Sequence, residues 1–230
     1  MEELPEFSFY VQPGLFEFQE YDTGGLESIP QLWFVAEALI SNSTDARLAA
    51  LNYIFEHDAA KGSTLITYIL TTRIKDPTPA IRKKIIQILA SLFKSDEGNM
   101  TASTDVKLNL YERFSAIEVE EVIAILQTVD MEATLLDQAE QIFQNSSIAG
   151  YHLINIIADR NQPISIRKLA ILYIGRIGYL DALPELERLE NRLESKLAGQ
   201  RSFTFTTAYT PKDTQLLPSI RTALSNLRAP

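Results

Sequence analysis

The chain has 230 residues, 46% of them hydrophobic and 22% charged, with a formal net charge of −9 at pH 7. This composition is ordinary for a globular protein, and the length suits one large domain or one stack of repeats. The absence of cysteine excludes disulfides, thiolate metal sites and a cysteine nucleophile.

The charges are arranged in blocks along the chain. Residues 1–46 contain nine acidic residues and no Lys or Arg, and residues 114–159 contain eight acidic residues and likewise no basic one. An acidic chain repels phosphate backbones, so the composition disfavours nucleic acid as a partner. No apolar stretch reaches the ~18 residues that a membrane span needs, and the N-terminus is acidic rather than basic. We therefore expect a cytoplasmic protein without membrane contact.

The first 27 residues do not have a helical pattern. Aromatic residues alternate with other residues on both sides of Pro13-Gly14, a pattern typical of two short strands joined by a turn. We predict a β-hairpin over residues 1–27. Isolated two-stranded pieces are marginally stable in water, so Phe7, Phe9, Phe16 and Phe18 are expected to cap the first helices.

From about Ser28 onward, apolar residues recur at helical spacing, interrupted by short polar breaks. The pattern predicts about five helix pairs and one additional short helix at 108–114. The pairs are 28–40 with 46–55, 65–74 with 81–93, 119–129 with 133–143, 148–157 with 164–177, and a helix opening at Asp181 with 217–227. Trp33 is assigned to the core stripe of the first helix.

The last pair is interrupted by an insertion at residues 199–211. Aromatic and Thr residues alternate there, which predicts a strand. We expect Phe203, Phe205 and Tyr209 to cover the last pair. An alternative is that an exposed strand edge pairs with another chain, which would give a homo-oligomer through the β segments.

A short phrase recurs at the start of the second helices. Pro79-Ala80-Ile81-Arg82 reappears as Pro218-Ser219-Ile220-Arg221, and in a longer form as Pro163-Ile164-Ser165-Ile166-Arg167. A repeated helix start indicates a repeated structural unit. Each pair has too little core to be stable alone, and stacking buries one pair on the next, as in an α-solenoid.

These phrases resemble HEAT repeats of the bacterial HEAT-like kind over residues 28–228. Asn161, Pro163, Ile166, Arg167 and Ala170 match the family's second-helix pattern, whereas the third pair departs from it. In that pair Leu136 stands at the Arg position. The resemblance implies an all-α fold, a right-handed α-α superhelix of residues 28–230. It also implies that the Arg ties its helix to a neighbouring Asp and that the second helices line the concave face.

No catalytic or metal site is predicted. His57 and His152 are 95 residues apart, and the His-Glu dipeptides of HEAT-like iron hydroxylases are missing. The acidic run Glu118, Glu120 and Glu121 is interpreted as a solvated first helical turn rather than a catalytic pair. No cofactor is expected.

We therefore predict a non-catalytic scaffold that binds another protein. The candidate contact residues are the aromatics of the two β segments and three basic residues on second helices: Phe7, Phe9, Phe16, Phe18, Arg82, Lys83, Arg167, Phe203, Phe205 and Tyr209. One alternative is an accessory subunit of a bilin-lyase-like enzyme. Another is a nucleic-acid binder, which would need Arg82-Lys83-Lys84 to form one positive groove with Lys168, Arg176 and Arg188.

Overall fold

The computed structural model describes residues 25–94, 101–201 and 212–229. Within these ranges the protein contains twelve α-helices, three short 3-10 helices and no strand, so it belongs to the all-α class as predicted. The predicted hairpin lies outside the described residues, except that residues 25–27 already belong to the first helix. The predicted strand around Phe203, Phe205 and Tyr209 also lies outside them.

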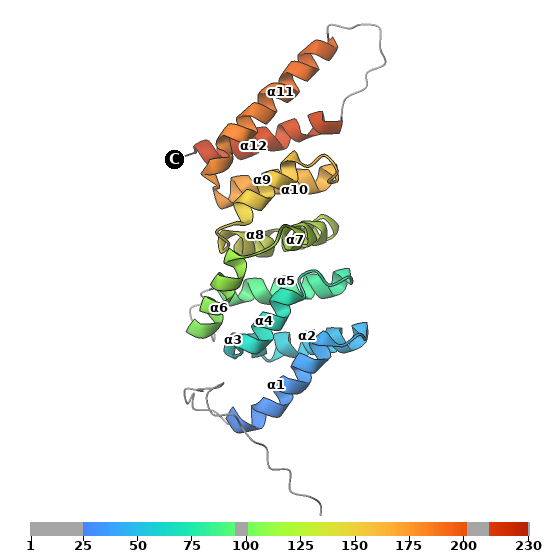
Figure 1. Cartoon of the computed structure of the whole chain (residues 1–230), viewed down its shortest axis with the longest axis vertical. Coiled ribbons are helices and arrows are strands. Elements are labelled where there is room, and N and C mark those ends of the chain that lie inside the picture. The colour runs from blue at the N-terminus through green and yellow to red at the C-terminus, as the bar shows by residue number, and fades with distance from the viewer. Residues whose placement is uncertain (1–24, 95–100, 202–211, 230) are drawn as a thin grey trace, which may run out of the picture.

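The helices pack as consecutive pairs that follow one another along the long axis of an elongated molecule (Figure 1). The pairs are α1 (Gly25–Ile40) with α2 (Thr44–Glu56), α4 (Thr64–Thr72) with α5 (Pro79–Phe93), α7 (Val119–Met131) with α8 (Leu136–Gln144), α9 (Ala149–Ala158) with α10 (Ile164–Ile177), and α11 (Leu183–Arg201) with α12 (Leu217–Arg228). The remaining elements are α3 (Ala59–Gly62), α6 (Thr104–Ser115) and the 3-10 helices η1 (Ala133–Leu135), η2 (Leu180–Ala182) and η3 (Lys212–Leu216).

The paired helices form two rows. The second helices α2, α5, α8, α10 and α12 each pack against the next one along the stack. On the other side α1, α4 and α6 form one row, and α7 packs on α9. Each pair therefore has neighbours before and after it, except at the two ends of the molecule.

Local sequence signals explain where the helices begin and end. Ser43, Ser63 and Ser103 each accept a hydrogen bond from a backbone N–H in the first turn of the following helix. Pro79 occupies the first turn of α5, where its missing N–H costs nothing. Gly178 ends α10 with a φ of 69°, a left-handed conformation that favours glycine.

Most helix boundaries lie within three residues of the predicted ones, and three differences affect the description of the chain. α1 begins three residues before Ser28, and α6 is longer than the predicted 108–114 because Ser103 caps it. α11 continues to Arg201, into the predicted 199–211 insertion. The insertion is therefore shorter at its start than the sequence pattern suggested.

One hydrophobic core runs through the described pairs. Leu51, Ile85, Ile125 and Ile171 are completely buried second- or first-helix residues from four different pairs. Burial of such a side chain contributes roughly 1.5–3 kcal/mol. Since these residues lie between pairs as well as within them, the core holds the stack together.

The prediction that Trp33 belongs to this core is wrong. Its side chain is 66% exposed, whereas Val35, Ala36 and Leu39 are buried. At 3.6 residues per turn, the three buried residues share one side of α1 and Trp33 projects from another. The sequence did not reveal this because Phe34, which is also exposed, makes the outer side of α1 as apolar as the inner side.

Candidate partner-binding surfaces

The recurrent arginines are structural groups that tie one pair to the next. Arg47, the fourth residue of α2, donates to the carbonyls of Ser41 and Asn42 in the turn between α1 and α2. Its Nε lies 3.0 Å from Oδ2 of Asp76, which precedes α5 in the next pair. Asp76 is buried and also accepts from the Thr78 N–H. The first two pairs are thus joined by a buried ion pair.

Arg82, the fourth residue of α5, repeats this arrangement with different acceptors. Its Nη1 donates to the Asp76 carbonyl at 2.9 Å, and its Nε donates to Oγ1 of Thr128 on α7 at 2.9 Å. The neighbouring Lys83 forms a 2.9 Å ion pair with Glu132 at the end of α7. Both proposed contact residues of α5 are therefore engaged with the third pair.

Arg167, the fourth residue of α10, joins the fourth pair to the fifth. Its Nε donates to the Ile157 carbonyl, and its Nη1 lies 2.6 Å from Oδ1 of Asp213 in η3. The Arg167 guanidinium holds the pKa of the Asp213 carboxyl below its usual range. Because the Arg167 side chain is only 4% exposed, it has no free surface to offer a partner.

The last arginine of the series has no following pair to contact. Arg221 of α12 turns back to the first helix of its own pair, where it forms ion pairs with Glu190 and Glu194. These two carboxylates raise the pKa of the Arg221 guanidinium. It is more exposed than Arg47 and Arg167, as expected at an end of the stack.

The third pair has Leu136 at the Arg position. Here the side chains that join the third and fourth pairs come from α10 of the fourth pair. The Tyr173 hydroxyl of α10 donates to the Leu136 carbonyl at 3.1 Å. Arg176, also on α10, lies 2.6 Å from both Asp137 and Glu140 of α8. Tyr173 is fully buried, and this burial raises the pKa of its hydroxyl.

The basic residues proposed for a nucleic-acid groove are largely neutralised within the chain. Lys83 pairs with Glu132, Arg176 with Asp137 and Glu140, and Arg188 with Glu185. Lys84 lies 4.0 Å above the ring of Phe55. A phosphate backbone would have to displace these partners before it could contact the cations.

The acidic run at the start of α7 is only partly solvated, so its interpretation needs correction. Glu118 is exposed and forms a 2.7 Å ion pair with Lys75, which lowers the pKa of Glu118. Glu121 is buried, forms an ion pair with Arg113 and accepts from the Glu118 N–H. These contacts cap α7 and join it to α6.

Neither histidine lies in a cluster of ligands. The His57 ring packs on Tyr53 with centroids 4.3 Å apart, and Nε2 of His152 lies 2.9 Å from the Ile117 carbonyl. In the parts of the chain that the structure describes, no three His, Asp or Glu side chains converge as metal ligands. Over the same ranges, no helix combines the length and apolar character of a membrane span.

Large apolar side chains are exposed on α4, the first helix of the second pair, and on the additional helix α6. Sequence reasoning missed this surface. We call this surface the first-helix face and define it by Leu65 and Tyr68 on α4 and Leu108 and Tyr111 on α6. α4 and α6 pack against each other, so the four side chains belong to neighbouring helices. The sequence could have identified these four residues, because they lie at helix positions outside the apolar pattern that faces the core.

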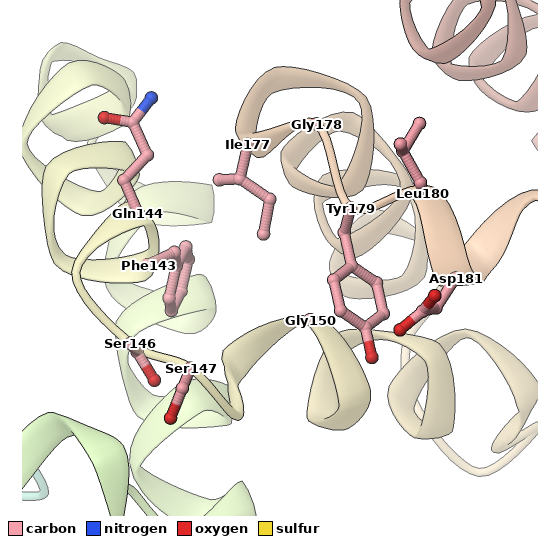
Figure 2. A pocket seen from close by; sticks show the side chains of 10 residues that line it. All are labelled: Phe143, Gln144, Ser146, Ser147, Gly150, Ile177, Gly178, Tyr179, Leu180 and Asp181. Carbon is pink, nitrogen blue, oxygen red and sulfur yellow. The ribbon is translucent and has the colours of Figure 1, made fainter.

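A shallow pocket of about 400 Å³ lies where α8, α9 and α10 meet (Figure 2). Phe143 and Ile177 face this opening, and the Tyr179 ring lies over Gly150. A Cβ atom at Gly150 would lie 2.4 Å from the Tyr179 ring, so the glycine makes this packing possible. The nearby Ser146 hydroxyl is already used, because it donates to the Phe114 carbonyl and accepts from the Ala149 N–H.

The seven aromatic candidates Phe7, Phe9, Phe16, Phe18, Phe203, Phe205 and Tyr209 lie outside the described residues. Over the residues that the structure describes, the protein is an all-helical stack of helix pairs. Comparison of the chain with protein-family models, curated proteins and solved structures gave no match.

Proposed function

We propose that this chain is a HEAT-like solenoid of five helix pairs that acts as a non-catalytic scaffold and binds another protein through its first-helix face. The observation that carries the proposal is the exposure of Leu65, Tyr68, Leu108 and Tyr111 on two adjacent helices. Aromatic and aliphatic side chains of this kind are the residues that anchor protein interfaces.

The second-helix row is the less suitable surface. Its basic residues are used between pairs, as shown by Arg82 with Thr128 and Lys83 with Glu132. Breaking such contacts would reduce any gain from binding a partner. The same internal pairing supports a protein partner over a nucleic acid.

Binding assays on the purified full chain test this proposal. We would immobilise wild-type protein and the double variant Tyr68→Ser/Leu108→Ser, incubate each with lysate of the native host, and identify retained proteins by mass spectrometry. Both replaced side chains are exposed, so the helices should remain folded. We expect a protein that wild type retains and the double variant loses.

Phe55→Ser provides a matched control, because Phe55 is an exposed aromatic on the second-helix row. This variant should keep the partner. The proposal fails if Phe55→Ser and the double variant lose the same protein equally, if no protein is specifically retained, or if retention disappears on nuclease treatment.

A further inference from the structure

The outer side of α4 offers almost no polar group. This helix, Thr64–Thr72, contains no charged residue, and three of its four threonine hydroxyls already donate to backbone carbonyls. Leu65 and Tyr68 project outward and are 42% and 53% exposed. A surface helix normally carries charged or polar residues opposite its apolar stripe. The outer side of α4 is therefore chemically suited to contact with an apolar surface.

α6 repeats the same exposed pattern beside α4. Leu65 and Tyr68 are three positions apart on α4, and Leu108 and Tyr111 have the same spacing on α6. Residues three positions apart lie on the same side of a helix. Because α4 and α6 pack against each other (Figure 1), the two Leu-x-x-Tyr pairs form neighbouring apolar rows. A helix with apolar residues at three- and four-residue spacing is the natural complement of two such rows.

Carboxylates border the first-helix face. Asp105 and Glu112 of α6 lie three positions before and four positions after Leu108, so they are its neighbours on the helix surface. Both side chains are exposed, as is Glu120 in the first turn of α7. None of the three carboxylates forms an ion pair with another described residue. The chain thus places uncompensated negative charge beside an exposed leucine.

Few cations offset these carboxylates. On α6, Arg113 is held by the buried Glu121, which leaves Lys107 outside an ion pair among the described residues. Arg73, at the end of α4, donates to a carbonyl of α1. Residues 114–159, which include α7 and α9, contain no Lys or Arg. The surroundings of the first-helix face are therefore acidic on balance.

We propose that the first-helix face binds a basic amphipathic helix of a partner protein. The apolar side of that helix packs on the two Leu-x-x-Tyr rows, and Lys or Arg residues on its flanks face Asp105 and Glu112. This inference rests on the proposed scaffold function and names the chemistry of its partner. A second copy of the chain that docked through the same face would bring these carboxylates together, so charge disfavours that occupant.

Fluorescence anisotropy with labelled peptides and the full chain tests the proposal. The probe is a peptide of about five helical turns with Leu on one side and Lys at the other positions. One comparison peptide replaces every Lys by Glu, and another scrambles the sequence so that the apolar side is lost. We expect wild type to bind the Leu/Lys peptide at least about tenfold more tightly than either comparison peptide.

Variants of the chain locate the binding site. Asp105→Asn/Glu112→Gln should weaken binding of the Leu/Lys peptide about three- to tenfold, and this difference should shrink in high salt. Asp45→Asn/Glu56→Gln is the matched control, because it removes the same charge from exposed positions of α2. It should leave binding unchanged. Far-UV circular dichroism checks that all variants keep their helices.

Four results would overturn the proposal. They are equal binding of the Lys and Glu peptides, equal binding of the scrambled peptide, equal weakening by the two charge-removing variants, and dimers in sedimentation velocity that Tyr68→Ser/Leu108→Ser abolishes. The last result would assign the face to a second copy. If the Leu/Lys peptide does not bind but wild type still retains a host protein that Tyr68→Ser/Leu108→Ser loses, this proposal fails and the scaffold function stands. Failure of the scaffold function would show instead as the absence of any retained host protein.

Discussion

Two joints in the second-helix row are held together in opposite ways. Between the fourth and fifth pairs, Arg167 reaches forward from α10 to Asp213. Between the third and fourth pairs, Tyr173 and Arg176 reach backward from α10 to the start of α8, where Leu136 stands at the arginine position. Both joints therefore contain polar contacts, but these come from different residues and run in opposite directions along the stack.

The physical reason lies in the backbone. The Ile157 carbonyl that Arg167 engages lies in the last turn of α9, where carbonyls have no partner within the helix, and it would cost free energy if left without a donor. At the joint where Leu136 stands at the arginine position, Tyr173 and Arg176 of the adjacent helix supply the polar contacts instead. The first joint has the most buried ion pair of this kind, because both Arg47 and Asp76 are almost inaccessible to solvent.

Arg47→Met should produce the largest loss. The substitution leaves the buried Asp76 carboxylate without its cation, which typically costs about 3–5 kcal/mol. Urea denaturation followed by circular dichroism measures the change in the free energy of unfolding. Arg47→Met/Asp76→Asn should lose less, because it leaves no uncompensated charge and an amide oxygen can still accept from Thr78 N–H. Equal stability of single and double variants would contradict this account.

Arg167→Met should have an intermediate effect of about 2 kcal/mol, the order of one charge-assisted hydrogen bond. Asp213 is partly exposed, so water can compensate some of the lost interaction. The effect is measured as the difference in the free energy of unfolding between wild type and Arg167→Met at neutral pH.

The ion pair between Arg167 and Asp213 should also make the free energy of unfolding depend on pH. Arg167 lowers the folded-state pKa of Asp213, so the stability it contributes is present above the unfolded-state pKa of about 4 and is lost as pH falls through the folded-state value. The stability gap between wild type and Arg167→Met should therefore narrow below about pH 4. Asp213→Asn should likewise make the free energy of unfolding depend less on pH in the acidic range. If the difference in stability between wild type and Arg167→Met stays constant as pH falls, the Asp213 carboxyl is not responsible.

Tyr173→Phe should have the smallest effect, about 1 kcal/mol for one neutral hydrogen bond at the backward tie. Burial raises the folded-state pKa of Tyr173, so its contribution is complete below the unfolded-state pKa of about 10 and is lost as pH rises above that value. Thermal unfolding on both sides of that pH measures both effects. Tyr151→Phe, at an exposed tyrosine of α9, should change neither; an equal loss there would show that the hydroxyl of Tyr173 is not the cause.

The sequence predicted the elements that depend on local chemistry. Helix pairs follow from apolar spacing, and Arg167 contacts a carboxylate as the resemblance implied. It did not predict Thr128 as the acceptor of Arg82, because the two residues are 46 positions apart and a hydroxyl carries no charge signal. Trp33 was misplaced because spacing identifies a buried stripe only when polar residues border it.

Local sequence signals alone are enough to predict that the described part of this protein consists of paired helices, since turn residues and apolar periodicity act within a few residues of each other. Which apolar residues remain exposed, such as Tyr68, Leu108 and Trp33, depends on the tertiary packing, and only the tertiary structure shows it. It also decided that Tyr173 replaces the missing arginine of the third pair. Both outcomes depend on which helices become neighbours, and that choice is made by the packing of the whole stack.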